Sequence, residues 1–95
     1  MTSAFTVLTS PHFERLAKGQ LKKQSEFVTI LGEAIDILQN DPYNQSRSHA
    51  IRKLAGPQTE GQWRLRVGRW RFRYDILGQN VELKYCGLRR EDTYR

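Results

Sequence analysis

The sequence predicts an α+β domain, in which a helical hairpin packs on one face of a small, mostly antiparallel sheet. Three observations predict it. Apolar residues recur with helical spacing between Phe27 and Leu38, hydrophobic and polar residues alternate strictly between 62 and 76, and a β-rich segment opens the chain. The element order is β-α-α-β-β-β. A length of 95 residues allows one domain, residues 1–95.

The helical hairpin follows the first strand, which is expected over residues 4–9. Ser10 and Pro11 are typical of a helix start, because serine caps free N–H groups and proline loses nothing at the first helical position. A polar break follows at 22–25, where Ser25 is a second expected N-cap. The second helix is expected to end at Asn40, before Asp41-Pro42.

The second half of the chain predicts a three-stranded meander. Residues 43–61 are expected to form a loop, with one helical turn near 49–54. Strands are expected over 62–67, 69–76 and 81–85, where apolar side chains occupy every second position. Cys86 follows the last strand among apolar neighbours, which predicts a structural role.

Composition excludes several classes of protein. One cysteine excludes an intrachain disulfide, and His12 and His49 alone add too few ligands for a zinc cluster. No apolar run approaches the ~20 residues that cross a bilayer, and the N-terminus lacks the pattern of a signal peptide. We therefore expect a cytoplasmic protein without a bound cofactor. His12 is expected to be exposed, and His49 to take no part in chemistry.

The net charge of +6 is concentrated in the last third of the chain. Residues 61–95 carry nine Lys and Arg against four Asp and Glu, and eight of the nine are arginine. The alternation places five arginines on one face of the predicted hairpin, where like charges repel. These are Arg64, Arg66, Arg69, Arg71 and Arg73. Arginine binds phosphate through paired hydrogen bonds and stacks on bases, so the pattern favours a nucleic acid as the partner.

Several segments resemble the RelE/ParE toxins of bacterial type II toxin–antitoxin systems. The strands from Trp63 to Ile76 resemble the central hairpin of that family. Asp41-Pro42-Tyr43 and the Lys53-Leu54-Ala55-Gly56 segment resemble its connecting segment. Arg89-Arg90-Glu91-Asp92-Thr93-Tyr94 resembles its closing segment. The resemblance covers essentially the whole chain and implies the RelE-like microbial ribonuclease fold.

The resemblance implies a toxin that an adjacent antitoxin neutralises, and the arginines favour the RelE branch. Toxins of that branch enter the ribosomal A site and cut mRNA without a metal ion, as the 2′-OH attacks the adjacent phosphate. The partners implied are the ribosome, mRNA and an acidic antitoxin that wraps the toxin. Two alternatives stay open: a ParE-like inhibitor of DNA gyrase, and an RNA-binding module of the same fold without catalysis.

The family motifs also imply roles for individual residues. Arg71 and one of Arg89 and Arg90 would stabilise the charge of the transition state. Arg64 and Arg66 would hold the phosphate and orient the 2′-OH, and Tyr94 would stack on a base or relay a proton. Further contacts with the nucleic acid are expected from Lys53, Arg69 and Arg73.

Two departures from the family pattern concern the general base. Some relatives carry lysine at the positions of Arg64 and Arg66, and many carry histidine at the position of Arg89. Arginine stays protonated and cannot accept a proton. The base would therefore be Tyr94 or a group of ribosomal RNA. Without either, the protein would be a slow nuclease or would block without cutting.

Overall fold

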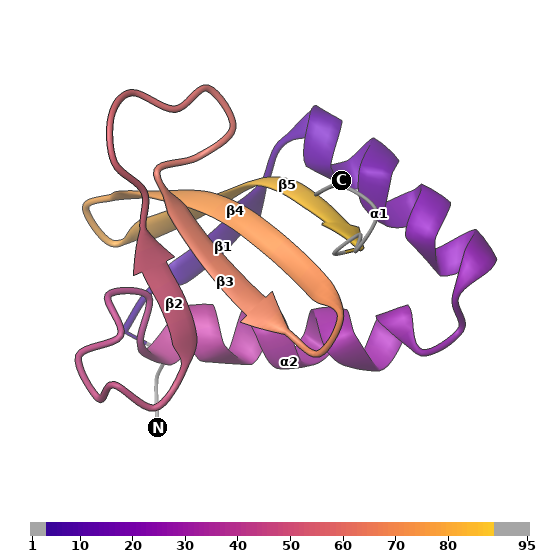
Figure 1. Ribbon diagram of the computed structural model, residues 1–95, viewed down its shortest axis with the longest axis horizontal. Coiled ribbons are helices and arrows are strands. Elements are labelled where there is room, and N and C mark those ends of the chain that lie inside the picture. The colour runs from indigo at the N-terminus through magenta and orange to yellow at the C-terminus, as the bar shows by residue number, and fades with distance from the viewer. Residues whose placement is uncertain (1–3, 89–95) are drawn as a thin grey trace, which may run out of the picture.

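The structure is a computed structural model that describes residues 4–88. In that range the elements follow the order β-α-α-β-β-β-β, one strand more than predicted. They are β1 (Thr6–Thr9), α1 (Pro11–Lys23), α2 (Phe27–Asn40), β2 (Ala50–Lys53), β3 (Trp63–Val67), β4 (Trp70–Leu77) and β5 (Asn80–Leu88). The strands form a single sheet in the order β1-β5-β4-β3-β2, where only β1 pairs in parallel (Figure 1). The predicted α+β class is confirmed.

The two helices begin and end close to the predicted positions. The Ser10 hydroxyl accepts a hydrogen bond from the Phe13 N–H at 3.0 Å, with Pro11 at the first helical position, so the predicted cap is confirmed. The prediction for Ser25 is wrong: the N-cap of α2 is Glu26, and it makes no side-chain capping bond. No helix within residues 4–88 is long and apolar enough to span a bilayer.

The segment 43–61 differs from the prediction of a loop with a helical turn. Residues Ala50–Lys53 form β2, an edge strand that pairs antiparallel with β3. A strand of four residues is too short to show a clear alternation of apolar and polar residues in the sequence. The free edge of β3 decides the conformation, because it offers unpaired backbone groups.

The core lies between the helices and one face of the sheet. Phe72 of β4 lies at its centre, with ring centroids 6.4 Å from Phe13 of α1 and 6.2 Å from Phe27 of α2. The buried Tyr74 hydroxyl donates to the Pro42 carbonyl at 2.7 Å, which ties the end of α2 to the sheet. The helices therefore cover one face and leave the other for the polar positions of the strands.

A β-bulge in β5 changes which face its second half presents. Tyr74 pairs with Leu83, whereas Arg73 pairs with Tyr85, so Lys84 is an extra residue. The prediction that Tyr85 continues the alternation of Val81 and Leu83 is therefore wrong. Tyr85 lies on the polar face, and the strand runs on to Leu88.

Candidate nucleic-acid interface

Five arginines form two rows across the polar face of the sheet. The first row runs Arg52, Arg64, Arg73 and then Tyr85, on β2, β3, β4 and β5. The second row runs Ala50, Arg66, Arg71 and Gly87 on the same four strands. We call this set the arginine face: Arg52, Arg64, Arg66, Arg71 and Arg73.

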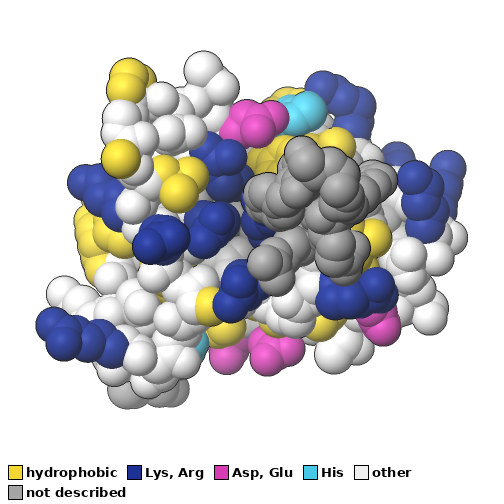
Figure 2. Space-filling view, viewed as in Figure 1, with side chains coloured by type: hydrophobic (Ala, Val, Ile, Leu, Met, Phe, Trp, Pro, Cys, Tyr) yellow, Lys and Arg dark blue, Asp and Glu magenta, His cyan; other side chains and the backbone are white. Residues whose placement is uncertain are grey.

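The register brings these positive charges close together. Side chains directly opposite one another on antiparallel strands have Cβ atoms about 5 Å apart. Figure 2 shows Lys and Arg side chains gathered over this side of the sheet. Arg52 and Arg66 are exposed, and Arg64 and Arg71 are half-buried. Such a cluster of positive charge favours an anion beside it.

Arg73 is tied to the loop before β3. Its Nε and Nη2 donate to the Gly61 carbonyl at 3.2 and 2.9 Å, and Nη2 also donates to Gln58 Oε1 at 3.0 Å. Gln62 N–H donates to Asp75 Oδ1 at 2.8 Å and fixes the same loop. Arg73 thus has a structural task that its predicted role in nucleic-acid binding did not include.

Arg69 does not join the other arginines. It lies in the two-residue turn between β3 and β4, where Gly68 has φ 58°. Its Nη2 lies 3.0 Å from Glu26 Oε2, and its guanidinium lies 5.2 Å from the centroid of the Trp70 ring. The prediction that Arg69 continues the alternation is wrong, because the chain reverses one residue before strand β4 begins.

Lys53 lies beside the arginine face but not on it. By register it faces Trp63, which shares its side of the sheet with the core residue Leu65. The Lys53 ammonium lies 5.7 Å from the centroid of the Trp63 ring. Arg89, Arg90 and Tyr94 lie outside the described residues.

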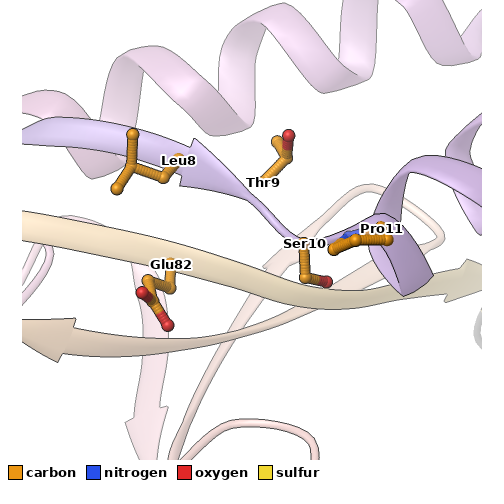
Figure 3. Close-up of a pocket in the computed structure, with 5 residues that line it drawn as sticks. All are labelled: Leu8, Thr9, Ser10, Pro11 and Glu82. Atoms are coloured by element: carbon orange, nitrogen blue, oxygen red, sulfur yellow. The ribbon is translucent and has the colours of Figure 1, made fainter.

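Two acidic residues lie next to the first arginine row, on the side toward the turn between β4 and β5. Asp75 and Glu82 face each other across β4 and β5, and Glu82 lies 3.3 Å from Lys84 Nζ. Beyond them lies a cavity of about 430 Å³, lined by Leu8, Thr9, Ser10, Pro11 and Glu82 (Figure 3). Its serine is occupied in capping α1, and the hydroxyl of its Thr9 donates to the Glu14 carboxylate. The cavity lies on the acidic side of the sheet and does not belong to the arginine face.

The remaining reactive side chains stand apart from the arginine face or are inert. Burial raises the pKa of the Cys86 thiol to about 12, so it is not a nucleophile at neutral pH. His12 is half exposed and lies 3.8 Å from Glu60, and His49 lies 3.8 Å from Asp41 within its own loop. Among residues 4–88 no three His, Cys, Asp or Glu side chains cluster as metal ligands would.

Sequence reasoning missed two members of the polar face. Arg52 was expected in a loop, although the short run Ala50–Lys53 carries it at an alternating position. Tyr85 was assigned to the core face. The spacing of Leu83 and Cys86, three residues where two are expected in a regular strand, is the signal of the bulge that moves it.

The architecture is the one that the RelE/ParE resemblance implies: a helical hairpin on one face of a small, mostly antiparallel sheet. A solved structure with this fold is the YoeB dimer from Staphylococcus aureus, with a TM-score of 0.63 and 15% identity. The match covers 88% of this chain and 95% of that chain. At this identity the likeness shows the fold, which confirms the RelE-like fold that we expected. No family model and no curated protein matches the sequence.

Proposed function

We propose that the chain is the toxin of a type II toxin–antitoxin system and that it cuts mRNA in the ribosomal A site. The observation that carries the proposal is the pair of arginine rows on a fold shared with YoeB. The RelE-like segments of the sequence support it from a separate direction. The RNA backbone carries one phosphate for each nucleotide, and arginines on one face of a sheet can bind several phosphates together.

The proposed reaction is an in-line transesterification at one phosphate. The 2′-oxygen forms a bond to phosphorus, the bond from phosphorus to the 5′-oxygen breaks, and a 2′,3′-cyclic phosphate and a 5′-OH result. The 2′-OH loses its proton to a base, and the 5′-oxygen gains one. Arg71 would neutralise the charge that grows on the phosphate oxygens, while Arg64 and Arg66 hold the phosphate.

Proton transfer is assigned to groups other than the arginines, because guanidinium does not give up its proton near neutral pH. Tyr94 and a group of ribosomal RNA are the two candidates. The chain would then supply positioning and charge, and the ribosome would supply the rest of the site. Removing one well-placed donor in such a site lowers the rate by roughly 10²–10³.

Inducible expression with mapping of mRNA ends tests the proposal. Wild type is expected to stop growth and to produce new 5′ ends within translated regions. Arg71→Ala is expected to lose both effects, while Arg15→Ala, a change on helix α1, keeps them. Intact transcripts in arrested cells would contradict the proposal, and inhibited supercoiling in those cells would favour a gyrase inhibitor. RNA binding with neither arrest nor cleavage would favour a non-catalytic module.

The proposed antitoxin is an acidic segment that covers the arginine face. Its carboxylates would remove the repulsion among the arginines, so association should slow steeply as salt rises. Stopped-flow association at several salt concentrations tests this: a rate that does not change with salt would contradict it.

A further inference from the structure

Tyr85 ends the first arginine row, and its ring leans over the end of the second. A Cβ atom built on Gly87 would lie 2.6 Å from the Tyr85 hydroxyl oxygen and 3.1 Å from Cζ. The hydroxyl therefore fills the place that a side chain at position 87 would occupy. That place lies directly opposite Arg71, the register partner of Gly87.

Two features of β5 produce this arrangement. The extra residue Lys84 turns Tyr85 to the polar face. Gly87 is buried, and its φ lies outside the left-handed region, so its backbone does not call for glycine. A side chain at position 87 would instead meet the outer end of the Tyr85 ring, which would have to move aside.

We infer that Tyr85 is a further residue of the RNA site, whose hydroxyl donates a hydrogen bond to the phosphate held by Arg66 and Arg71. The inference rests on the proposed function and adds a neutral, directional donor to a set of charged ones. The ring lies over Gly87, so the hydroxyl already points toward the end of the second row before the ligand arrives.

The surroundings of Tyr85 leave room for the rest of a nucleotide. Tyr85 and Gly87 line a groove of about 280 Å³ between β5 and α1, whose other wall carries Gln20 and Lys23. A nucleotide adjoining the phosphate at Arg71 can therefore lie against the ring, and aromatic side chains are favourable stacking partners for bases.

The test compares Tyr85→Phe, which removes only the hydroxyl, with Tyr43→Phe as the matched control. Tyr43 is exposed and contacts Phe5 and Trp63. We would measure two quantities at low salt: affinity for a single-stranded RNA made uncleavable by 2′-O-methylation, and the single-turnover rate of cleavage of mRNA on ribosomes. Tyr85→Phe is expected to weaken binding about 10-fold and to slow cleavage at least as much. Tyr43→Phe should stay within about twofold of wild type.

Gly87→Ala tests the same contact without touching Tyr85. The added methyl group must displace the ring, so this variant should lose affinity as Tyr85→Phe does. A denaturation curve confirms that it is folded, and in the double variant with Tyr85→Phe the two losses should not add.

The outcomes separate the inference from the proposed function. If wild type cleaves and Tyr85→Phe matches it in both measurements, the inference is overturned and the function stands. If wild type binds RNA without cleaving it, the proposed nuclease fails, while a weaker Tyr85→Phe still supports the contact. If wild type neither binds nor cleaves RNA, both fail.

Discussion

Gly61 is the residue on which the loop beside the arginine face depends. Its φ is 109°, and a Cβ atom there would lie 2.6 Å from the Tyr74 backbone nitrogen. Its carbonyl accepts both bonds from the Arg73 guanidinium noted above. A side chain at position 61 would thus strain the backbone and push the loop off strand β4.

We predict that Gly61→Ala lowers the free energy of unfolding by more than about 2 kcal/mol, since backbone strain and a steric clash combine. Gly56→Ala is the control, because φ is 73° there but nothing lies within 4 Å of its Cβ. That change should cost about 1 kcal/mol. Urea denaturation measures both, and equal losses would contradict the role given to Gly61.

Cys86 gives a pH dependence at the alkaline end. Its pKa rises from 9.0 to about 12 on folding, because burial disfavours the thiolate. The resulting stability is complete below pH 9 and is lost as the pH rises from 9 towards 12. We predict that unfolding free energy falls between pH 8 and pH 10.5 by about 1–2 kcal/mol more in wild type than in Cys86→Ala. Parallel curves for the two proteins would show that the thiol does not contribute.

At the scale of elements, Asp41 organises the turn that leads into β2. Its carboxylate accepts from the Gln45 N–H at 2.8 Å, the Ser46 N–H at 3.1 Å and the Ser46 hydroxyl at 2.6 Å. Burial acts to raise the pKa of this group. The three hydrogen bonds, helped by the nearby His49, outweigh it and hold the pKa below the ordinary 3.8.

The contribution of Asp41 is therefore present above pH 3.8 and lost as the pH falls through the lowered value. We predict that Asp41→Asn destabilises the protein by about 1 kcal/mol at pH 7. The difference from wild type should shrink at pH 2–3. Asp36→Asn, on the exposed side of α2, is the control and should have little effect at either pH. A loss that stays constant with pH would show that the charge is not the cause.

Elements whose hydrophobic pattern extends over many residues could be predicted from the sequence. Elements whose conformation depends on a neighbouring strand could not. The stripe from Phe27 to Leu38 and the alternation of β3 and β4 extend over many residues, and the structure has both. Strand β2 and the bulge at Lys84 depend on pairing with β3 and β4. Their local sequence permits them without requiring them.

At the scale of the whole molecule, one face of the sheet forms the core and the other forms the proposed binding surface. One face carries the aromatic core under the helices, and the other carries five arginines in register. The sequence predicts this division and places four of the five arginines on the polar face. The place of Arg52 on this face could not be predicted without strand β2. The place of Arg69 off this face depends on where the chain turns between β3 and β4.

The roles of the arginines could not be read from alternation alone. Arg73 holds the Gly61 carbonyl and Arg69 holds Glu26, and each contact joins segments more than ten residues apart. Such partners come from the tertiary fold. Among the arginines predicted to hold the phosphate or stabilise the transition state, Arg64, Arg66 and Arg71 lie together in the structure.

The salt dependence of RNA binding tests the central claim, that the arginine face is where RNA binds. Each phosphate contact to a single strand contributes about 0.7 to the slope of log affinity against log salt concentration. The Arg66→Ala/Arg71→Ala double variant should therefore lower the slope by about 1.4. Arg69→Ala, which removes one positive charge from outside the face, should change the slope little. A double variant with the wild-type slope, or an equal effect per charge from Arg69→Ala, would contradict the assignment of this face.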